Sequence, residues 1–481
     1  MMYSTVEKIK ELFTSFSKSG ITAIDTLPQS GSERHYYRIH AAGKTYIATY
    51  GANLKENETF IYFSTHFKQK NLPVPAIFCI NPEKNIYIQE DLGDTSLLNR
   101  LEEQGFTEGV YTLYKKSLQQ LAGLQVTGHK GLDYNQCLTN TSFGKQAIMA
   151  DLLYFKYYFL DALHQPYDKQ KLIDDFEALS NYLSHTEYTY FMFRDFQSRN
   201  IMVKADDSIY FIDYQGGMRG APQYDVASLL WQAKANLPDD WKQRLLEDYM
   251  DAFEKVLSRS INKDSFRSQY NGYILIRLLQ VLGAYGFRGL FERKAHFLTS
   301  IPQALNNLKW FTGNQNIGIT LPEFKKVLDI CISEAVIQQF TPVQATAETP
   351  LVITINSFSY KKGIPADISE NGGGYVFDMR GILNPGRIDE YKTQSGLDKP
   401  VKDFLEQQTD MPVFLNGVYS IIDISVTDYI KRGFKSLMIN FGCTGGQHRS
   451  VFAAEALARH LRNKFKVKIV LTHTNKENWV K

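Results

Sequence analysis

Apolar and polar positions along the chain fall into three successive patterns, and each predicts a different kind of structure. In residues 1–93 an amphipathic helix pattern is followed by short apolar runs, HYYRIH, KTYIATY and NIYIQED, which predict strands. A helical stretch at about 55–70 separates the second run from the third. Helical periodicity then dominates residues 94–190 and 221–335, as in GVYTLYKKSLQQLAGLQ. From residue 351 on, apolar strands such as LVITINSF alternate with helices, which predicts an α/β domain.

The segment TPVQATAETP separates the helical region from the α/β region. It has two prolines, several small residues and no periodicity, which is typical of a linker. We therefore expect a first domain whose two parts span residues 1–93 and 94–340, a linker at 341–350, and a second domain at 351–481.

Composition indicates a globular protein outside the membrane. Hydrophobic residues make up 43% and charged residues 22% of the 481 residues. No apolar run approaches the roughly 20 residues that span a bilayer, and the N-terminus lacks the apolar region of a signal peptide. Cys79, Cys137, Cys331 and Cys443 are scattered without a CxxC pair, which fits a reducing cytoplasm. We expect a cytoplasmic location.

Charge is distributed unevenly along the chain. The net charge is only +3, but residues 431–481 hold eleven Lys or Arg against two Glu, a net of +9, so the remainder carries about −6. A basic C-terminal end is a candidate surface for RNA or another anionic ligand. A solvated helix face explains the same charges equally well.

The segment FRDFQSRNIMVKADDSIYFIDYQ, residues 193–215, carries the strongest chemical signal. Asp195 and Asn200 fit D-x-x-x-x-N, in which a kinase places the base that accepts the substrate hydroxyl proton and a magnesium ligand. NIMVK, the polar turn ADDS and IYFID predict a hairpin that brings Asn200 beside Asp213. Two oxygen ligands held there can bind Mg²⁺ together with the phosphates of ATP. Any one of these residues alone would be an ordinary solvated side chain.

Two further segments occupy the places where a kinase holds ATP. GSERHYYRI lies between two strands, and Gly31 and Ser32 allow a tight turn whose N–H groups can approach phosphates. QEDLGD follows a strand at the position of a kinase hinge, where Glu90, Asp91 and Leu92 would offer backbone groups to adenine. By itself, a Gly-Ser turn is equally typical of a simple hairpin.

SERHYYRI, QEDLGD, FRDFQSRN, FIDYQ and APQYDVASLL together resemble the aminoglycoside-phosphotransferase-like kinases. Within that group the chain is most similar to the anomeric kinases of N-acetylmuramate and N-acetylglucosamine, over about residues 20–300. The resemblance implies an α+β, protein-kinase-like bilobal domain that phosphorylates a sugar hydroxyl with ATP and Mg²⁺. It further implies Asp195 as the base, Asn200 and Asp213 as the metal ligands, and Asp225 as a brace of the catalytic loop. Asp225 would alternatively cap the helix VASLLWQ.

The chain departs from this pattern at two positions. Phe193 replaces the catalytic-loop histidine, and Tyr50 stands near the place of the lysine that pairs with phosphates. Arg34 is the candidate substitute cation, ordered by Glu58 on the following helix, although a surface salt bridge would equally account for it. Arg38 offers a second cation. These losses leave open a non-catalytic lobe that binds sugar or nucleotide.

A second motif, CTGGQHRS, connects an apolar strand to a helix near the C-terminus. A Gly-rich turn at a helix N-terminus directs several backbone N–H groups to one point and so attracts phosphate. His448 and Arg449 would add charge-assisted hydrogen bonds. Cys443 and Arg449 also fit C-x-x-G-x-x-R-S, the loop of cysteine-dependent phosphatases.

The phosphatase interpretation has two weaknesses. Gly442, rather than His, precedes the cysteine, and no general-acid loop is evident, since Asp423 and Asp428 lie in a helix-like run.

SFSYKKGIP, FDMRGILNP, SGLDKPV and GCTGGQHRSVFAAEALA closely resemble the C-terminal domain of the RNase adapter RapZ, over about residues 351–476. The resemblance implies a smaller α/β domain that binds an amino-sugar phosphate, glucosamine-6-phosphate, and a small regulatory RNA. That family's P-loop domain is absent, since no GxxxxGK[ST] occurs, and the kinase-like unit takes its place. The candidate ligand site comprises Asp378, Arg380, Asn384, Cys443, Thr444, Gly445, Gly446, Gln447, His448, Arg449 and Ser450.

The sequence therefore predicts an ATP- and Mg²⁺-dependent kinase of a small cell-wall amino sugar, joined to a domain that senses a phosphosugar or binds RNA. Two alternatives remain open: a non-catalytic, RNA-binding regulatory adapter, and a cysteine-dependent phosphatase at Cys443.

Overall fold

A computed structural model describes residues 2–27, 34–186, 189–292, 295–367, 369 and 373–480. Contacts divide the chain into two units. The first contains residues 1–284 and 303–333, and the second contains residues 285–302 and 334–481. The predicted linker therefore lies inside the second unit, where the Ala345 N–H donates to the Phe465 carbonyl oxygen at 2.7 Å.

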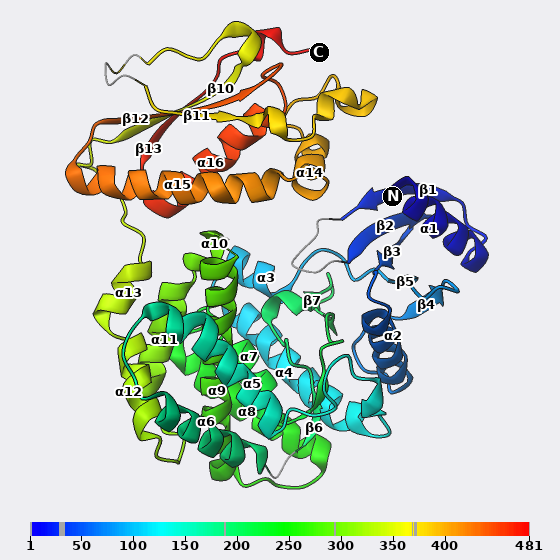
Figure 1. Cartoon of the computed structure of the whole chain (residues 1–481). Helices are drawn as coiled ribbons and strands as arrows, with labels where there is room; N and C mark the ends of the chain where they lie inside the picture. The colour runs from blue at the N-terminus through cyan, green and yellow to red at the C-terminus, as the bar shows by residue number, and fades with distance from the viewer. Residues whose placement is uncertain are drawn as a thin grey trace. The chain divides into compact units, whose positions relative to one another are not determined.

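The first unit begins with a five-stranded antiparallel sheet (Figure 1), in the order β1-β2-β3-β5-β4. Alternate residues of the central strands, such as Tyr37, Ala48 and Ile88, are buried together with Ile9 and Phe13 of α1. The predicted strands, and the helix between the second and third of them, are confirmed. The elements are α1 (Met2–Phe16), β1 (Ile21–Thr26), β2 (His35–Ala41), β3 (Lys44–Tyr50), α2 (Leu54–Gln69), β4 (Ile77–Ile80) and β5 (Ile86–Glu90).

A larger helical part follows, with two short antiparallel strand pairs, β6–β9 and β7–β8. Its helices bury apolar residues at spacings of three and four, as Tyr114, Leu118 and Leu121 of α4 illustrate. The helices are α3 (Leu97–Gln104), α4 (Glu108–His129), α5 (Lys145–Phe155), α6 (Lys169–Ser184), α7 (Gln223–Leu230), α8 (Asp239–Leu257), α9 (Lys263–Gly286), α11 (Ile301–Asn314) and α12 (Pro322–Cys331). The strands are β6 (Tyr190–Met192), β7 (Ile201–Val203), β8 (Ile209–Phe211) and β9 (Met218–Gly220).

One helical stretch, residues 263–291, is long and apolar enough by length and composition to cross a membrane. It consists of α9 and the π-helical turn η5 (Phe287–Phe291). Phe266, Leu279 and Leu282 are completely buried within the fold. The apolar composition of α9 is therefore explained by core packing.

The second unit contains a four-stranded sheet in the order β11-β12-β10-β13, and all of its strand pairs are parallel. Ile355 and Ile439 are register partners on β10 and β12 and belong to one core with Leu457 of α16. The predicted α/β domain is confirmed. The strands are β10 (Val352–Ser359), β11 (Tyr375–Asp378), β12 (Ser436–Cys443) and β13 (Lys468–His473). The helices are α10 (Ala295–Leu298), α13 (Glu334–Phe340), α14 (Lys399–Gln407), α15 (Met411–Arg432) and α16 (Arg449–Phe465).

Candidate functional sites

The β7–β8 hairpin brings the three predicted kinase residues together. Ile201 pairs with Phe211, so Asn200 and Asp213 flank the same end of the hairpin. Asn200 Nδ2 donates to the backbone oxygen of Asp195 at 2.9 Å and to Asp213 Oδ2 at 3.3 Å. Because its amide nitrogen is engaged, Asn200 has its Oδ1 left for a cation. The predicted hairpin is thus confirmed, and it unites residues 13 positions apart.

Asp213 has the backbone conformation and the raised pKa expected of a carboxylate that binds a cation. Its φ of +69° lies in the left-handed region, which is strained for a residue other than glycine. Burial raises the pKa of this carboxyl, and the charge of Asp195 raises it further, while a hydrogen bond from Gln215 opposes the shift. A divalent cation would favour the ionised carboxylate and so oppose the increase in pKa. No cluster of three or more His, Cys, Asp or Glu occurs among the described residues, so phosphates and water would complete the coordination.

Asp225 organises the catalytic loop through its backbone. Its carboxylate accepts hydrogen bonds from the N–H groups of Phe193 at 2.8 Å and Arg194 at 3.0 Å, and from Gln125 Nε2 at 2.9 Å. These bonds hold Arg194 at a φ of +78°, a conformation that costs about 1 kcal/mol for such a residue. Complete burial raises the pKa of Asp225 to about 7. Asp225 does not cap its helix, because α7 begins at Gln223 and Pro222 is at the cap position.

Phe193 packs where the kinase pattern has histidine. It is fully buried, and its ring lies 5.2 Å from Phe196 and 6.0 Å from Tyr214 between ring centres. The neighbouring Arg194 forms a bidentate ion pair with Asp151 of α5, at 2.7 and 2.9 Å. Asp225 therefore holds the backbone of the loop, and Asp151 holds the side chain of Arg194. The sequence pattern missed both Asp151 and Gln125.

Arg34 is a buried cation whose charge acts on Asp213, one of the predicted metal ligands. Its guanidinium lies 2.8 Å from Glu56 on α2, and Glu56 also accepts from Gln215 Nε2 at 3.2 Å. Gln215 in turn donates to Asp213 at 2.8 Å, so one chain of contacts links Arg34 to Asp213. Burial opposes the charge of Arg34, but Tyr87, Tyr36 and Glu56 outweigh it, and the pKa of the guanidinium is raised.

The prediction that Glu58 orders this cation is wrong. Glu58 pairs with Lys84 at 2.8 Å on an exposed face, because it lies on a different side of α2 from Glu56. Tyr50, near the expected lysine position, ends β3 and lies beside His35. The predicted phosphate-covering turn, Gly31 and Ser32, lies outside the described residues.

Arg38 ties the predicted hinge segment to the sheet, so this cation has a structural role. Arg38 contacts Asp91 and Asp94, each at 2.7 Å. Burial by itself would raise the pKa of Asp91, but Arg38 and the Gly93 N–H lower it overall. Glu90 pairs with Lys204 at 2.9 Å, and Leu92 is buried. With the side chains engaged in this way, a nucleotide would meet the backbone of this segment.

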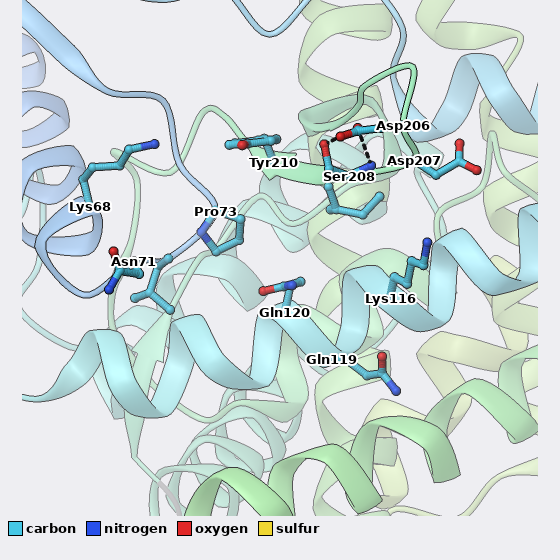
Figure 2. A pocket seen from close by; sticks show the side chains of 12 residues that line it. Lys68, Asn71, Pro73, Lys116, Gln119, Gln120, Asp206, Asp207, Ser208 and Tyr210 are labelled. Carbon is cyan, nitrogen blue, oxygen red and sulfur yellow. Dashed lines mark hydrogen bonds between the residues drawn. The ribbon is translucent and has the colours of Figure 1, made fainter.

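A cavity of about 590 Å³ lies at the turn end of the same hairpin (Figure 2). Lys68, Lys116, Asp206 and Tyr210 are among the side chains that line it, and Asp206 accepts from Ser208 at 2.6 Å. Asn200 and Asp213 lie at the opposite end of the hairpin. The cavity is therefore separate from the candidate phosphoryl-transfer site.

In the second unit, three backbone carbonyl groups of the loop that follows β12 accept hydrogen bonds from side chains. Gly446 has a φ of +65°, and a Cβ there would lie 2.9 Å from the Ser359 nitrogen, so glycine is required. The Thr444 carbonyl oxygen accepts a hydrogen bond from the Ser359 hydroxyl at 2.7 Å. The Gly445 carbonyl accepts from the Asn475 side chain at 2.7 Å, and the Gly446 carbonyl accepts from the Trp479 ring N–H at 2.9 Å. The Gly446 N–H donates to Cys443 Sγ at 3.2 Å, so the other N–H groups of the loop and the N-terminus of α16 are the polar features that an anion could contact.

The polar side chains of this loop are directed into the protein. Gln447 donates to the Gln394 carbonyl at 2.8 Å, and Arg449 donates to the Ile382 carbonyl at 2.7 Å. His448 Nε2 lies 2.9 Å from the Tyr391 carbonyl. Burial lowers the pKa of both His448 and Arg449. These three residues thus tie to the loop Ile382, which lies in FDMRGILNP, and residues 391–394, which lie just before SGLDKPV.

The remaining predicted residues reach the same sheet edge by a different route. Asp378 ends β11 as the register partner of Gly442 and pairs with Arg380 at 2.6 Å. Arg380 also covers the Tyr360 ring at 4.0 Å, and the side chain of Asn384 accepts from the Gly386 N–H at 3.3 Å. Parallel strands therefore gather Asp378, Arg380 and the loop at one edge, as expected for a ligand site in such a sheet.

Cys443 lies in surroundings that suit a structural thiol. It is 2% exposed, it accepts from the Gly446 N–H at 3.2 Å, and its sulfur is 3.1 Å from Ser450 Oγ. A Cβ at position 442 would lie 2.4 Å from the Phe358 ring, so the histidine of a phosphatase loop does not fit there. Asp423 pairs with His460 and Lys464, and Asp428 pairs with Arg432. The geometry argues against a phosphatase. All four cysteines are free thiols.

Comparisons with known proteins agree with this division. Residues 26–260 match the model of the phosphotransferase enzyme family, and residues 351–477 match the RapZ C-terminal domain. A curated nucleotide-binding protein of Endomicrobium trichonymphae is 37% identical over 166 residues, which are 33% of this chain and 52% of that protein. One of Clostridium botulinum, strain Eklund 17B, is 41% identical over 124 residues, 26% of this chain and 40% of that protein. The chain spans about half or less of these relatives.

Solved structures with a similar fold include two small-molecule kinases. A choline kinase of Streptococcus pneumoniae is 13% identical with a TM-score of 0.41, covering 64% of this chain and 99% of that one. A Plasmodium vivax ethanolamine kinase is 15% identical with a TM-score of 0.43, covering 63% of this chain and 84% of that one. From the two family models, we conclude that the chain joins a domain of the phosphotransferase enzyme family to a RapZ C-terminal domain.

Proposed function

We propose that the first unit is a small-molecule kinase that transfers the γ-phosphoryl group of ATP to a hydroxyl of an amino sugar, such as N-acetylmuramate or N-acetylglucosamine. The observation that supports this most directly is the convergence of Asp195, Asn200 and Asp213 at one end of the hairpin. The side chain of Asp195 is 48% exposed, so a substrate hydroxyl can reach it.

In this proposal each residue has one task. Asp195 accepts the proton of the attacking hydroxyl. Asn200 and Asp213 hold Mg²⁺, which when bound neutralises charge on the phosphates. Arg34, kept in place by Glu56, faces the same phosphates, and the backbone of Glu90 to Leu92 receives the adenine. Asp225 keeps the loop in one conformation before substrate binds, so that less reorganisation accompanies the transfer.

The test is ATP turnover by the purified chain with Mg²⁺ and a panel of free sugars, beside Asp195→Ala. Turnover that an amino sugar stimulates and that Asp195→Ala abolishes supports the proposal. Loss of a general base lowers turnover by roughly 10²- to 10⁴-fold. Sugar-independent ATP hydrolysis that survives in Asp195→Ala would contradict it.

A non-catalytic adapter is the second candidate, because Tyr50 stands near the place of the expected lysine. The two candidates differ in a direct measurement. A kinase binds ATP more tightly when Mg²⁺ is present and turns it over with sugar, whereas an adapter shows neither property and retains only ligand binding by the second unit.

For the second unit we propose binding of an amino-sugar phosphate at the loop of Thr444 to His448, or of RNA at the basic residues 431–481, in a cytoplasmic protein of cell-wall amino-sugar salvage. The engaged carbonyls and the helix N-terminus support an anionic ligand. Kinase activity that no amino-sugar phosphate alters would contradict coupling between the units. RNA binding should weaken steeply with salt, because it would depend on Lys and Arg contacts with phosphates.

A further inference from the structure

A second arginine lies beside the candidate base, on a helix that the kinase pattern does not include. Arg277 is on α9, and its residue is only 5% exposed. Its Nη1 lies 3.8 Å from Asp195 Oδ1 and donates to Gln280 one turn further along the helix. Arg277 is therefore fixed at the wall of the site.

The charge of Arg277 is incompletely balanced. Burying a cation is costly unless an anion is within hydrogen-bond distance. The other arginine nearby, Arg194, has such an anion in Asp151, at 2.7 and 2.9 Å. For Arg277, the described residues supply the amide of Gln280, the nearby Tyr224 and the carboxylate of Asp195 at 3.8 Å, and none of these is an anion within hydrogen-bond distance. When Asp195 accepts a proton from the substrate, even that charge is neutralised.

From this imbalance, and resting on the proposed function above, we infer that Arg277 forms a subsite for a carboxylate on the sugar. An acidic sugar would place its carboxylate on the guanidinium while its hydroxyl contacts Asp195. Arginine and carboxylate form paired, charge-assisted hydrogen bonds, and these strengthen when the pair is shielded from water. The substrate of this enzyme is then an acidic amino sugar, and Arg277 selects it over neutral ones.

N-acetylmuramate and N-acetylglucosamine provide a matched pair of probes, because they differ only by the lactyl ether that carries the carboxylate. We expect the wild-type chain to have the higher kcat/KM for N-acetylmuramate. Arg277→Gln should lower that value by about 30-fold or more, the usual loss when one partner of a buried charge pair is removed. Turnover of N-acetylglucosamine should change by less than about threefold. Arg267→Gln is the control, since Arg267 is on the same helix, is 40% exposed and pairs with Glu247.

A second variant tests the charge without removing the arginine. Gln280→Glu would place a carboxylate at the existing hydrogen bond and neutralise Arg277, so the preference for the acidic sugar should fall while the helix retains its size and packing. This variant serves if Arg277→Gln fails to fold. Equal losses on both sugars in these variants, or a wild-type chain without any preference, would overturn the subsite.

Equilibrium binding of the two sugars separates this inference from the proposed function. If the wild-type chain phosphorylates neither sugar, the proposed function fails. The subsite still stands if N-acetylmuramate binds more tightly than N-acetylglucosamine and Arg277→Gln removes the difference. If the two sugars bind equally, or if the difference survives in Arg277→Gln, the subsite is wrong.

Discussion

The catalytic loop of the first unit and the loop after β12 in the second unit are both crowded with polar residues, yet they use them in opposite ways. In the catalytic loop the backbone is held from outside by Asp225, and the side chain of Asp195 remains 48% exposed. In the second loop, Gln447 and Arg449 direct their side chains onto carbonyls, and Cys443 is 2% exposed. The first arrangement presents side chains for chemistry, and the second presents backbone for binding.

This comparison teaches that a motif's residue types do not decide its role. Cys443 and Arg449 satisfy a phosphatase pattern, but the groups that would act are already engaged within the fold. Asp195, Asn200 and Asp213 satisfy a kinase pattern, and the Asn200 side chain links the other two at one end of the hairpin. What separates the two cases is the exposure of the residue that would act, because the Asp195 side chain is 48% exposed and Cys443 is 2% exposed.

The largest expected effect is on Asp213, a proposed metal ligand at the end of the hairpin. Asp213→Asn removes the anionic ligand, and sugar-dependent ATP turnover should fall by roughly 100-fold or more, because a bound cation contributes several kcal/mol of charge stabilisation. Titration of turnover with Mg²⁺ should show that the variant needs a higher concentration. An unchanged magnesium dependence would mean that Asp213 is not a ligand.

The next effect is on the brace of the same loop. Burial raises the pKa of Asp225 from 3.8 to about 7, so between these values the folded protein binds a proton that the unfolded chain releases. This contribution to stability therefore falls as pH rises from about 4 to 7. The side chain of the variant Asp225→Asn cannot ionise. The free energy of unfolding of the wild type, minus that of this variant, should therefore decrease from pH 5 to pH 8 when both are measured by urea unfolding. A difference that stays constant with pH would contradict the assignment.

A smaller effect is expected at the strand that enters the second loop. Gly442→Ala would place a Cβ 2.4 Å from Phe358 and 2.5 Å from Tyr360, and overpacking of this kind costs about 1–3 kcal/mol. Gly445→Ala is the matched control, because nothing lies within 4 Å of its Cβ. Denaturant unfolding of the second unit should separate the two variants. Equal stability of the two variants would show that Phe358 and Tyr360 can move to accommodate the added methyl group.

Local sequence patterns predicted those parts of the molecule that depend on short-range spacing. The strands of residues 35–50 and 86–90 and the β7–β8 hairpin follow from alternation and turn residues. The contact of Glu56 with Arg34 could also have been predicted from the sequence. It lies four residues before Phe60, on the buried face that continues to Ser64, whereas Glu58 is off that face. Helical phase would have distinguished the two glutamates.

Other site residues depend on contacts that no local pattern contains. Asp151 reaches Arg194 across 43 positions, and Arg277 reaches Asp195 across 82. Each lies on a helix whose pattern reports only that one face is buried. Tertiary packing alone determines which polar residue on that helix faces the loop.

The central claim is that the first loop performs chemistry while the second serves binding and structure. The direct test measures sugar-dependent and Mg²⁺-dependent ATP turnover, beside hydrolysis of a generic aryl phosphate, for the wild-type chain, Asp195→Asn and Cys443→Ser. Both substitutions are close in size to the residue they replace. We predict that Asp195→Asn abolishes the ATP reaction, that Cys443→Ser leaves it unchanged, and that no variant hydrolyses the aryl phosphate. Aryl phosphate hydrolysis that Cys443→Ser abolishes, or ATP turnover that survives in Asp195→Asn, would contradict the claim.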